Sequence, residues 1–113
     1  SPLARGRLAR PWGEVTKRVE NDPFGNQIYD ANAAADQRGN EAVAAVAKAK
    51  GKTMAQIALA WVMQKQPVTA PIVGVSKLEQ LTDAVGAVGV KLTPEDVAAL
   101  EASYTPRANA GFQ

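Results

Sequence analysis

The chain contains no histidine and no cysteine, and only 5% of its 113 residues are aromatic. The absence of histidine excludes imidazole acid–base chemistry and histidine ligation of metals. The absence of cysteine excludes thiol nucleophiles, disulfides and zinc fingers. We therefore expect no metal site and no catalytic residue of these types in this chain.

Long hydrophobic runs are also absent. No apolar stretch reaches the roughly 18 residues of a membrane-spanning helix, and the N-terminus has no hydrophobic signal-peptide segment. The hydrophobic fraction of 46% is ordinary for a soluble protein, but alanine dominates it, so the core must be built largely from small side chains. The default expectation is a cytoplasmic protein without a membrane partner.

Charge is low overall but unevenly distributed. The net charge of +2 is too small to imply a polyanionic partner by itself. The first eighteen residues contain a single acid, Glu14, and five basic residues. The basic residues are Arg5, Arg7, Arg10, Lys17 and Arg18. This crowding favours an anion near the N-terminal segment, although a solvated basic loop has the same composition. Residues 1–40 show no sustained apolar period, which predicts a long functional loop with short helical pieces.

Helical patterns follow this loop. Residues 41–50 are alanine-rich and predict a helix that Gly51 closes in a C′-like position. Thr53 and Gln56 have the spacing of a capping box, and the helix that they start should end before Pro67. Its apolar face includes Ile57 and Trp61, and we expect Trp61 to be a core residue.

Two further helices are expected in the C-terminal half. Residues 78–88 carry apolar side chains at helical spacing, which predicts an amphipathic helix with one apolar stripe. Thr93 caps the last helix, and Pro94 occupies its first turn. The buried face of this last helix is expected to include Leu100 and Tyr104.

Between these helices lies one strand-to-helix turn. The apolar, branched residues 71–75 suit a buried strand, with Gly74 allowing close backbone approach. Ser76 and Glu79 have the spacing of a capping box. A helix N-terminus carries unpaired N–H groups and partial positive charge, and Lys77 adds a full charge beside it. The turn is therefore either a phosphate-holding site or simply a well-capped helix after a core strand.

A lone strand has no ladder partner, so its backbone groups need a sheet that this chain does not contain. This mismatch predicts that residues 1–113 are an incomplete domain. In isolation the chain should be mainly helical, and its unpartnered apolar faces make self-association possible.

Several short motifs occur in an order that resembles a known family. The motifs are Ser1–Leu8, Pro11–Trp12, Ala55–Trp61, Thr69–Leu81, Leu92–Asp96, Leu100–Glu101 and Tyr104. In this order they resemble the C-terminal part of an aldo-keto reductase, close to the aryl-alcohol dehydrogenase-like branch. The resemblance implies an NADPH-dependent reductase of aldehydes or ketones on an α/β (β/α)8 TIM barrel. The chain would correspond to the end of the strand 7 loop, helix 7, strand 8, helix 8 and the C-terminal helix.

The resemblance also implies which residues contact NADP(H). The pyrophosphate would be held, largely through backbone groups, by Ser1, Leu3, Gly6 and Leu8. The adenosine 2′-phosphate would be held by Gly74, Ser76 and Lys77, and the adenine would be faced by Gln80, Asp83 and Ala84. Many relatives carry Arg in place of Gln80, which leaves the preference for NADP over NAD open. The family's catalytic Asp, Tyr, Lys and His lie in the N-terminal barrel portion, so this chain alone would lack a catalytic centre and would need that portion as its partner.

Two other functions are alternatives to this one. Two consecutive capped helices, at 54–65 and 77–88, and the basic N-terminus could belong to a small helical nucleic-acid-binding module. A helix-turn-helix needs a turn of about three to four residues, whereas a strand-like run intervenes here, so we do not expect nucleic acid as a partner. The chain could also be a truncated, non-catalytic interaction protein that binds through exposed helix faces.

Overall fold

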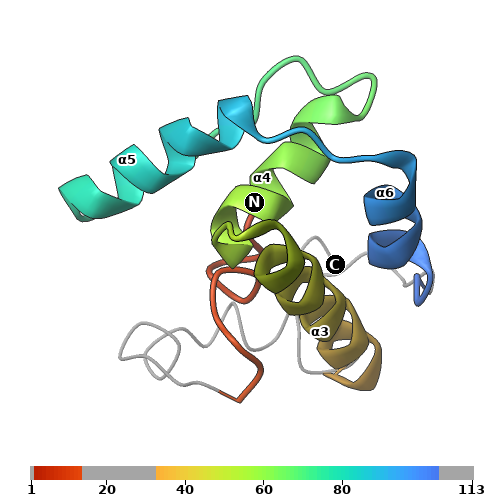
Figure 1. Ribbon diagram of the computed structural model, residues 1–113. Coiled ribbons are helices and arrows are strands. Elements are labelled where there is room, and N and C mark those ends of the chain that lie inside the picture. Colours follow the sequence, from red (N-terminus) through yellow and green to blue (C-terminus); the bar gives the residue numbers. More distant parts are fainter. Residues whose placement is uncertain (1, 14–32, 105–113) are drawn as a thin grey trace, which may run out of the picture.

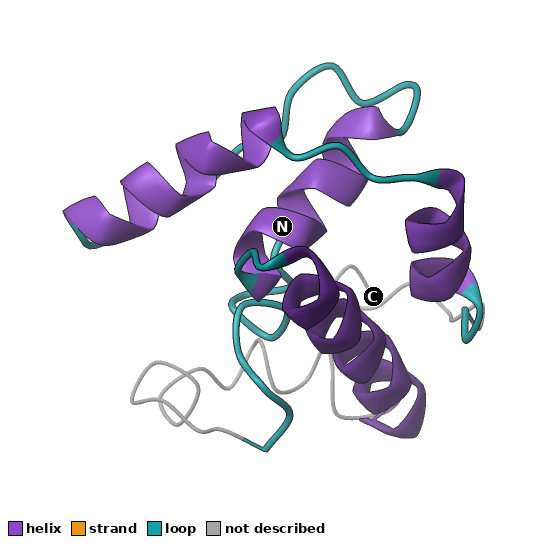
Figure 2. Cartoon of the chain, viewed as in Figure 1, coloured by secondary structure: helices purple, strands orange, loops and turns teal. Residues whose placement is uncertain are grey.

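The computed structural model describes residues 2–13 and 33–104, and these form a helical assembly (Figures 1 and 2). The helices are α3 (Ala33–Lys50), α4 (Met54–Gln64), α5 (Leu78–Gly86), the short 3-10 helix η2 (Ala87–Gly89) and α6 (Pro94–Glu101). Helix α4 contacts both α3 and α5, and α3 also contacts α6. Among the described residues no helix has the length and apolar character needed to cross a membrane.

Helix α3 begins at Ala33, so the predicted start at residue 41 was wrong. Its first turn is rich in alanine, the residue with the highest helix propensity. Further along, Asn40 is buried and hydrogen-bonded to the N-terminal segment, which holds this part of the helix in place. The predicted end is confirmed: Gly51 follows the helix with φ of +65°, a conformation that glycine adopts without strain.

Local side-chain caps fix the starts of α4 and α6. Thr53 Oγ1 accepts a hydrogen bond from Gln56 N, and Gln56 Oε1 accepts one from Thr53 N, which confirms the predicted capping box. Thr93 and Asp96 form the same reciprocal pair at α6. Each cap satisfies backbone donors that have no partner within the helix.

The cap of α5 differs from the prediction. Lys77 is the N-cap residue, and the side chain that reaches back is Gln80, not Glu79. Gln80 Oε1 accepts hydrogen bonds from Ser76 N at 2.9 Å and from Lys77 N at 3.3 Å. Ser76 is therefore not the N-cap, and its hydroxyl donates only a long bond of 3.3 Å to Gln80 Oε1.

The expected strand at residues 71–75 is not formed, and the described residues contain no strand (Figure 2). A strand needs a neighbouring strand to satisfy its backbone groups, and the described part of the chain offers none. Ile72 is consequently 90% exposed. The described residues therefore form a helical assembly, in which residues 71–75 are irregular chain.

The core is small and lies where α3 meets α4. Its buried side chains are Val43, Val46, Ala47 and Ile57. The partly buried residues that pack against this cluster are Leu8, Met54, Val90, Leu92 and Leu100. Ile57 is the largest fully buried side chain, in keeping with an alanine-rich composition.

Helix α5 extends away from this core in Figure 1, and large apolar side chains are exposed along α5 and η2. They are Leu78, Leu81 and Val85 on α5, and Val88 on η2. Two predicted core aromatics also lie outside the core. Tyr104 is 77% exposed because α6 already ends at Glu101, and Trp61 is only partly buried.

Candidate functional site

The N-terminal segment and α4 contribute to a larger and a smaller cavity, and the larger one, called here the main cleft, has a volume of about 890 Å³. It is lined by the N-terminal segment, by α4, by residues 72–77 and by one side of α5. A cavity of this size is within the range of small-molecule and cofactor sites.

The main cleft brings together residues that the sequence analysis placed in two separate clusters. The predicted cofactor residues that line it are Leu3, Gly6, Gly74, Ser76, Lys77, Gln80, Asp83 and Ala84. Leu8 instead packs against the core and faces the other cavity, and Ser1 lies outside the described residues. The contact of these residues with a cofactor stays a prediction, but their proximity is what a single ligand site requires.

The N-terminal wall of the main cleft is an unusual turn. Ala4, Arg5 and Gly6 have φ values of +49°, +57° and +90°, so three successive residues are in the left-handed region. Leu3 O accepts hydrogen bonds from Gly6 N at 3.0 Å and from Leu8 N at 3.1 Å, which closes the turn. Left-handed conformations of non-glycine residues cost energy and are concentrated at functional sites.

Two residues that support this wall were missed as site residues in the sequence. Arg10 lines the main cleft, with its guanidinium beside Gly6. Asn40 is 2% exposed, and its Nδ2 donates to Arg7 O at 2.7 Å and to Arg10 O at 2.8 Å. The crowding of arginine near the N-terminus was a signal for Arg10, but no local pattern marks Asn40, because its partners are about thirty residues away.

The main cleft is lined by both cationic and acidic side chains, and the cationic ones favour an anionic ligand. The cationic groups are Arg5, Arg10 and Lys77, and the acidic groups are Glu79 and Asp83. The Asp83 carboxylate accepts a hydrogen bond from the Thr53 hydroxyl, whose Oγ1 lies 2.8 and 3.0 Å from its two oxygens, so the carboxylate is held against the start of α4. Guanidinium and ammonium groups with nearby main-chain N–H groups are the donors that bind phosphates in proteins.

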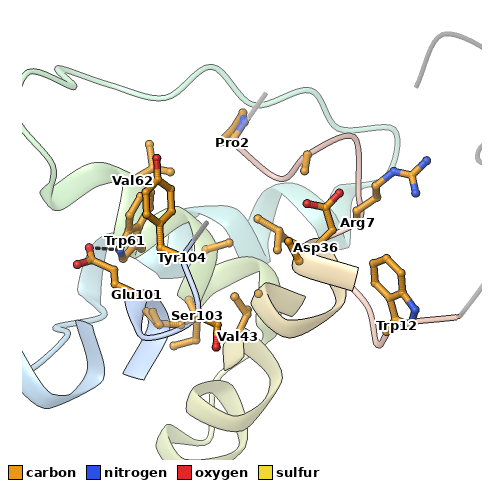
Figure 3. A pocket seen from close by; sticks show the side chains of 17 residues that line it. Pro2, Arg7, Trp12, Asp36, Val43, Trp61, Val62, Glu101, Ser103 and Tyr104 are labelled. Atoms are coloured by element: carbon orange, nitrogen blue, oxygen red, sulfur yellow. Dashed lines mark hydrogen bonds between the residues drawn. The ribbon is translucent and has the colours of Figure 1, made fainter. Parts of the chain in front are cut away.

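The smaller cavity, of about 430 Å³, lies among the N-terminal segment, α3, α4 and the end of α6, and its lining is largely apolar. Figure 3 shows Trp61 and Tyr104 close together at one end and Arg7, Asp36 and Trp12 at the other. It contains few of the predicted cofactor residues and is not the phosphate-binding candidate.

One polar cluster stabilises the edge of the smaller cavity. Glu101 Oε1 accepts hydrogen bonds from Lys65 Nζ and, at 3.0 Å, from Trp61 Nε1. Lys65 Nζ also lies 5.0 Å from the centre of the Trp61 ring. The hydrogen bond from Lys65, with that from Trp61, lowers the pKa of the Glu101 carboxyl below its usual value. These contacts tie α4 to α6, and the described residues include no cluster of acidic side chains that could hold a metal ion.

Comparison with known proteins identifies relatives along nearly the whole sequence. The sequence profile of the aldo/keto reductase family matches residues 1–105. Versiconal hemiacetal acetate reductase of Aspergillus parasiticus is 40% identical over 96% of this chain and 32% of its own length. A putative aryl-alcohol dehydrogenase of Saccharomyces cerevisiae is 35% identical over 95% of this chain and 31% of its own length.

A third relative shows the same partial coverage. Norsolorinic acid reductase B of Aspergillus parasiticus is 45% identical over 90% of this chain and 26% of its own length. The chain therefore spans only about a third, or less, of the curated relatives that it matches.

Proposed function

This chain belongs to the aldo/keto reductase family, and from that premise we propose that it forms the NADP(H)-binding part of an enzyme that reduces an aldehyde or ketone. The names of its relatives, two reductases and an alcohol dehydrogenase, support an oxidoreductase function. The observation that carries the cofactor proposal is the convergence of the two predicted phosphate-binding segments on the main cleft.

The residues of the main cleft fit a dinucleotide phosphate. Lys77 supplies an ammonium group at the start of α5, where helix N–H groups add partial positive charge. The left-handed turn at Gly6 also lines the main cleft, together with the two arginines Arg5 and Arg10. We assign Gly74, Ser76 and Lys77 to the 2′-phosphate, and Leu3 and Gly6 to the pyrophosphate. When bound, NADPH supplies the hydride.

The residues that protonate the carbonyl are proposed to come from outside this chain. A reductase needs a positioned acid near the carbonyl oxygen. The chain has no histidine, and its described tyrosine, Tyr104, lines the smaller cavity and not the main cleft. The chain matches about a third of the length of these relatives. We propose that the part of the enzyme corresponding to the other two thirds supplies the acid and most substrate contacts.

Cofactor affinity tests this proposal. The protein that carries this chain should bind NADPH, and Lys77→Ala should weaken NADPH binding by at least tenfold while NADH binding changes little. Lys91→Ala is the matched control, because Lys91 is exposed and does not line the main cleft. Equal loss of NADPH affinity in both variants, or no binding of either cofactor to the unaltered protein, would contradict the proposal.

Enzyme activity provides a separate test of the proposal that the acid lies outside this chain. The 113 residues alone should not oxidise NADPH in the presence of a reactive aldehyde such as 4-nitrobenzaldehyde. Protein-dependent turnover by the pure chain would show that the acid lies within it.

A further inference from the structure

The smaller cavity has the size and the walls of a binding site for a small apolar molecule. Its volume of about 430 Å³ lies within the range of small-molecule sites, and its lining is largely apolar. It is separate from the main cleft, because Pro2 is the one residue that lines both cavities. The proposed function assigns no ligand to this second space.

Gly39 leaves part of the smaller cavity open. It lies inside α3 with helical backbone, where glycine is unfavourable unless the position requires it. Ala35 and Val43, four residues before and after it on the same helix face, also line the cavity, so the Cβ direction at position 39 is towards this space. An ideal Cβ on Gly39 would meet no atom of the described residues within 4 Å. Packing against the described chain therefore does not account for this glycine.

Aromatic side chains line the smaller cavity at both ends. Figure 3 shows Trp61 and Tyr104 at one end and Trp12 at the other. The Trp61 ring is held in place, because its Nε1 donates to Glu101 Oε1 at 3.0 Å and Lys65 Nζ lies 5.0 Å from the ring centre. The Tyr104 side chain is 77% exposed, so most of its surface is open to contact. Flat rings of this kind stack on other aromatic rings.

The charges at the smaller cavity are balanced at each end. At one end, Glu101 accepts hydrogen bonds from Lys65 and Trp61. At the other end, the cavity is lined by one cation, Arg7, and one anion, Asp36. Neither end has an excess of one sign, and an ionic group of a ligand would lose its hydration against apolar walls. The smaller cavity therefore favours an uncharged ligand, in contrast to the main cleft.

We propose that the smaller cavity is a second ligand site, which binds an uncharged aromatic molecule. Trp61 and Tyr104 supply the stacking surfaces, and Gly39 leaves the space that the ligand fills. The site is independent of the proposed function, because the residues assigned to the phosphates of the cofactor do not line it.

The experiment titrates the whole protein with N-phenyl-1-naphthylamine, an uncharged aromatic probe whose fluorescence rises in apolar surroundings. Gly39→Leu should weaken its binding about tenfold or more, because the leucine occupies the space of the ligand. The melting temperature should stay the same or rise, since leucine favours helix more than glycine does. Ala45→Leu is the matched control, because Ala45 is exposed on α3 and lines neither cavity.

A second pair of variants tests the aromatic contact without filling the cavity. Tyr104→Ala should weaken probe binding about two- to tenfold, whereas Tyr104→Phe keeps the ring and should retain the affinity. The sulfonated probe 8-anilinonaphthalene-1-sulfonate has the same rings and one negative charge, and it should bind more weakly. Lys77→Ala, in the main cleft, should leave binding of the uncharged probe unchanged.

Four results would overturn the proposal. Absence of saturable binding would mean that another part of the enzyme fills the smaller cavity. Equal affinities in Gly39→Leu and Ala45→Leu would place the probe elsewhere, and loss of binding in Val85→Lys would place it on the exposed face of α5. Tighter binding of the sulfonated probe would contradict the uncharged ligand class.

Failure of this proposal and failure of the proposed function are distinguishable, because NADPH binding and its loss in Lys77→Ala are measured separately.

Discussion

The hydroxyl of Thr53 donates a hydrogen bond to the carboxylate of Asp83, with Oγ1 lying 2.8 Å from Oδ2 and 3.0 Å from Oδ1. The same hydroxyl accepts the capping bond from Gln56 N, so one side chain both starts α4 and holds α5. Gln56 Nε2 adds a bond to Asp83 O at 3.0 Å. The start of α4 is therefore the point to which the α5 side of the main cleft is attached.

A double-mutant cycle should detect this attachment. Thr53→Ala and Asp83→Ala should each lower stability, and their effects should be coupled by about 1 kcal/mol, because either change removes the same hydrogen bond. Thr53→Ser keeps the hydroxyl and should retain the coupling to Asp83. The free energies of unfolding of the four proteins measure it, and strictly additive effects would show that the two residues do not interact.

Ser76 separates a structural role from a cofactor role. The N-cap of α5 is Lys77, and the hydroxyl of Ser76 makes only a long bond, so Ser76→Asp should change the melting temperature little. If Ser76 faces the 2′-phosphate, the new carboxylate removes a donor and repels the ligand, and NADPH binding should weaken at least tenfold while NADH binding barely changes.

The control for Ser76→Asp is Thr82→Asp. Thr82 is exposed on α5, its hydroxyl donates to Leu78 O, and it does not line the main cleft. Both variants add one negative charge to the same helix region. An unchanged ratio of the two cofactor affinities in Ser76→Asp would rule out the 2′-phosphate role of this turn.

Acid should weaken the contact between α3 and α6. Lys50 Nζ lies 2.8 Å from Asp96 Oδ2, and this hydrogen bond, with that from Thr93 N, lowers the pKa of Asp96 below its ordinary value of 3.8. A carboxyl whose pKa is lower in the folded state contributes its stability above the unfolded value and loses it as pH falls through the folded value. Stability should therefore fall below about pH 4, and less steeply in Asp96→Asn.

The matched control for this pH effect is Glu95→Gln, which removes a carboxylate from the same helical turn. Chemical unfolding at pH 7 and at pH 3 gives the measurement. If Asp96→Asn and wild type lose the same stability between these pH values, the ion pair does not contribute to the acid sensitivity.

The exposed stripe of α5 should make the 113 residues self-associate when they are produced alone. Leu78 on α5 and Val88 on the adjoining η2 are each 75% exposed, and Val85 on α5 is 62% exposed, which leaves an apolar face in water. Sedimentation should show oligomers. If the chain stays monomeric instead, circular dichroism should show helix in the far ultraviolet and only a weak signal in the near ultraviolet. Val85→Lys should shift the chain towards monomer, whereas Thr82→Lys, on the same helix, should not. A sharply melting monomer of the unaltered chain would contradict this expectation.

Patterns that involve neighbouring residues were predicted well from the sequence. The Thr53–Gln56 box, the Thr93 cap and the glycine at position 51 depend on groups within one helical turn, so their chemistry can be recognised locally. The cap of α5 was misplaced by one residue because Gln80 and Glu79 can both reach back to a helix start, and the sequence does not decide between them.

Features that depend on distant partners were missed or only partly foreseen. The first turns of α3 depend on Asn40, whose carbonyl partners lie in the N-terminal segment. Residues 71–75 have the composition of a strand, but no strand forms where no neighbour is present. The pattern that placed Tyr104 in a core did not foresee that α6 ends at Glu101. The set of cofactor residues came from resemblance, because no local pattern could place residues 3 and 76 beside one cavity.

The N-terminal turn also has a consequence for protein engineering. Leu3, Arg5 and Gly6 line the main cleft, whereas Ala4 and Arg7 line the smaller cavity. The turn therefore separates the two cavities, and neighbouring positions in its sequence face different cavities. Libraries that vary positions 4 and 7 should therefore change the lining of the smaller cavity while the residues at positions 3, 5 and 6, which line the main cleft, stay constant.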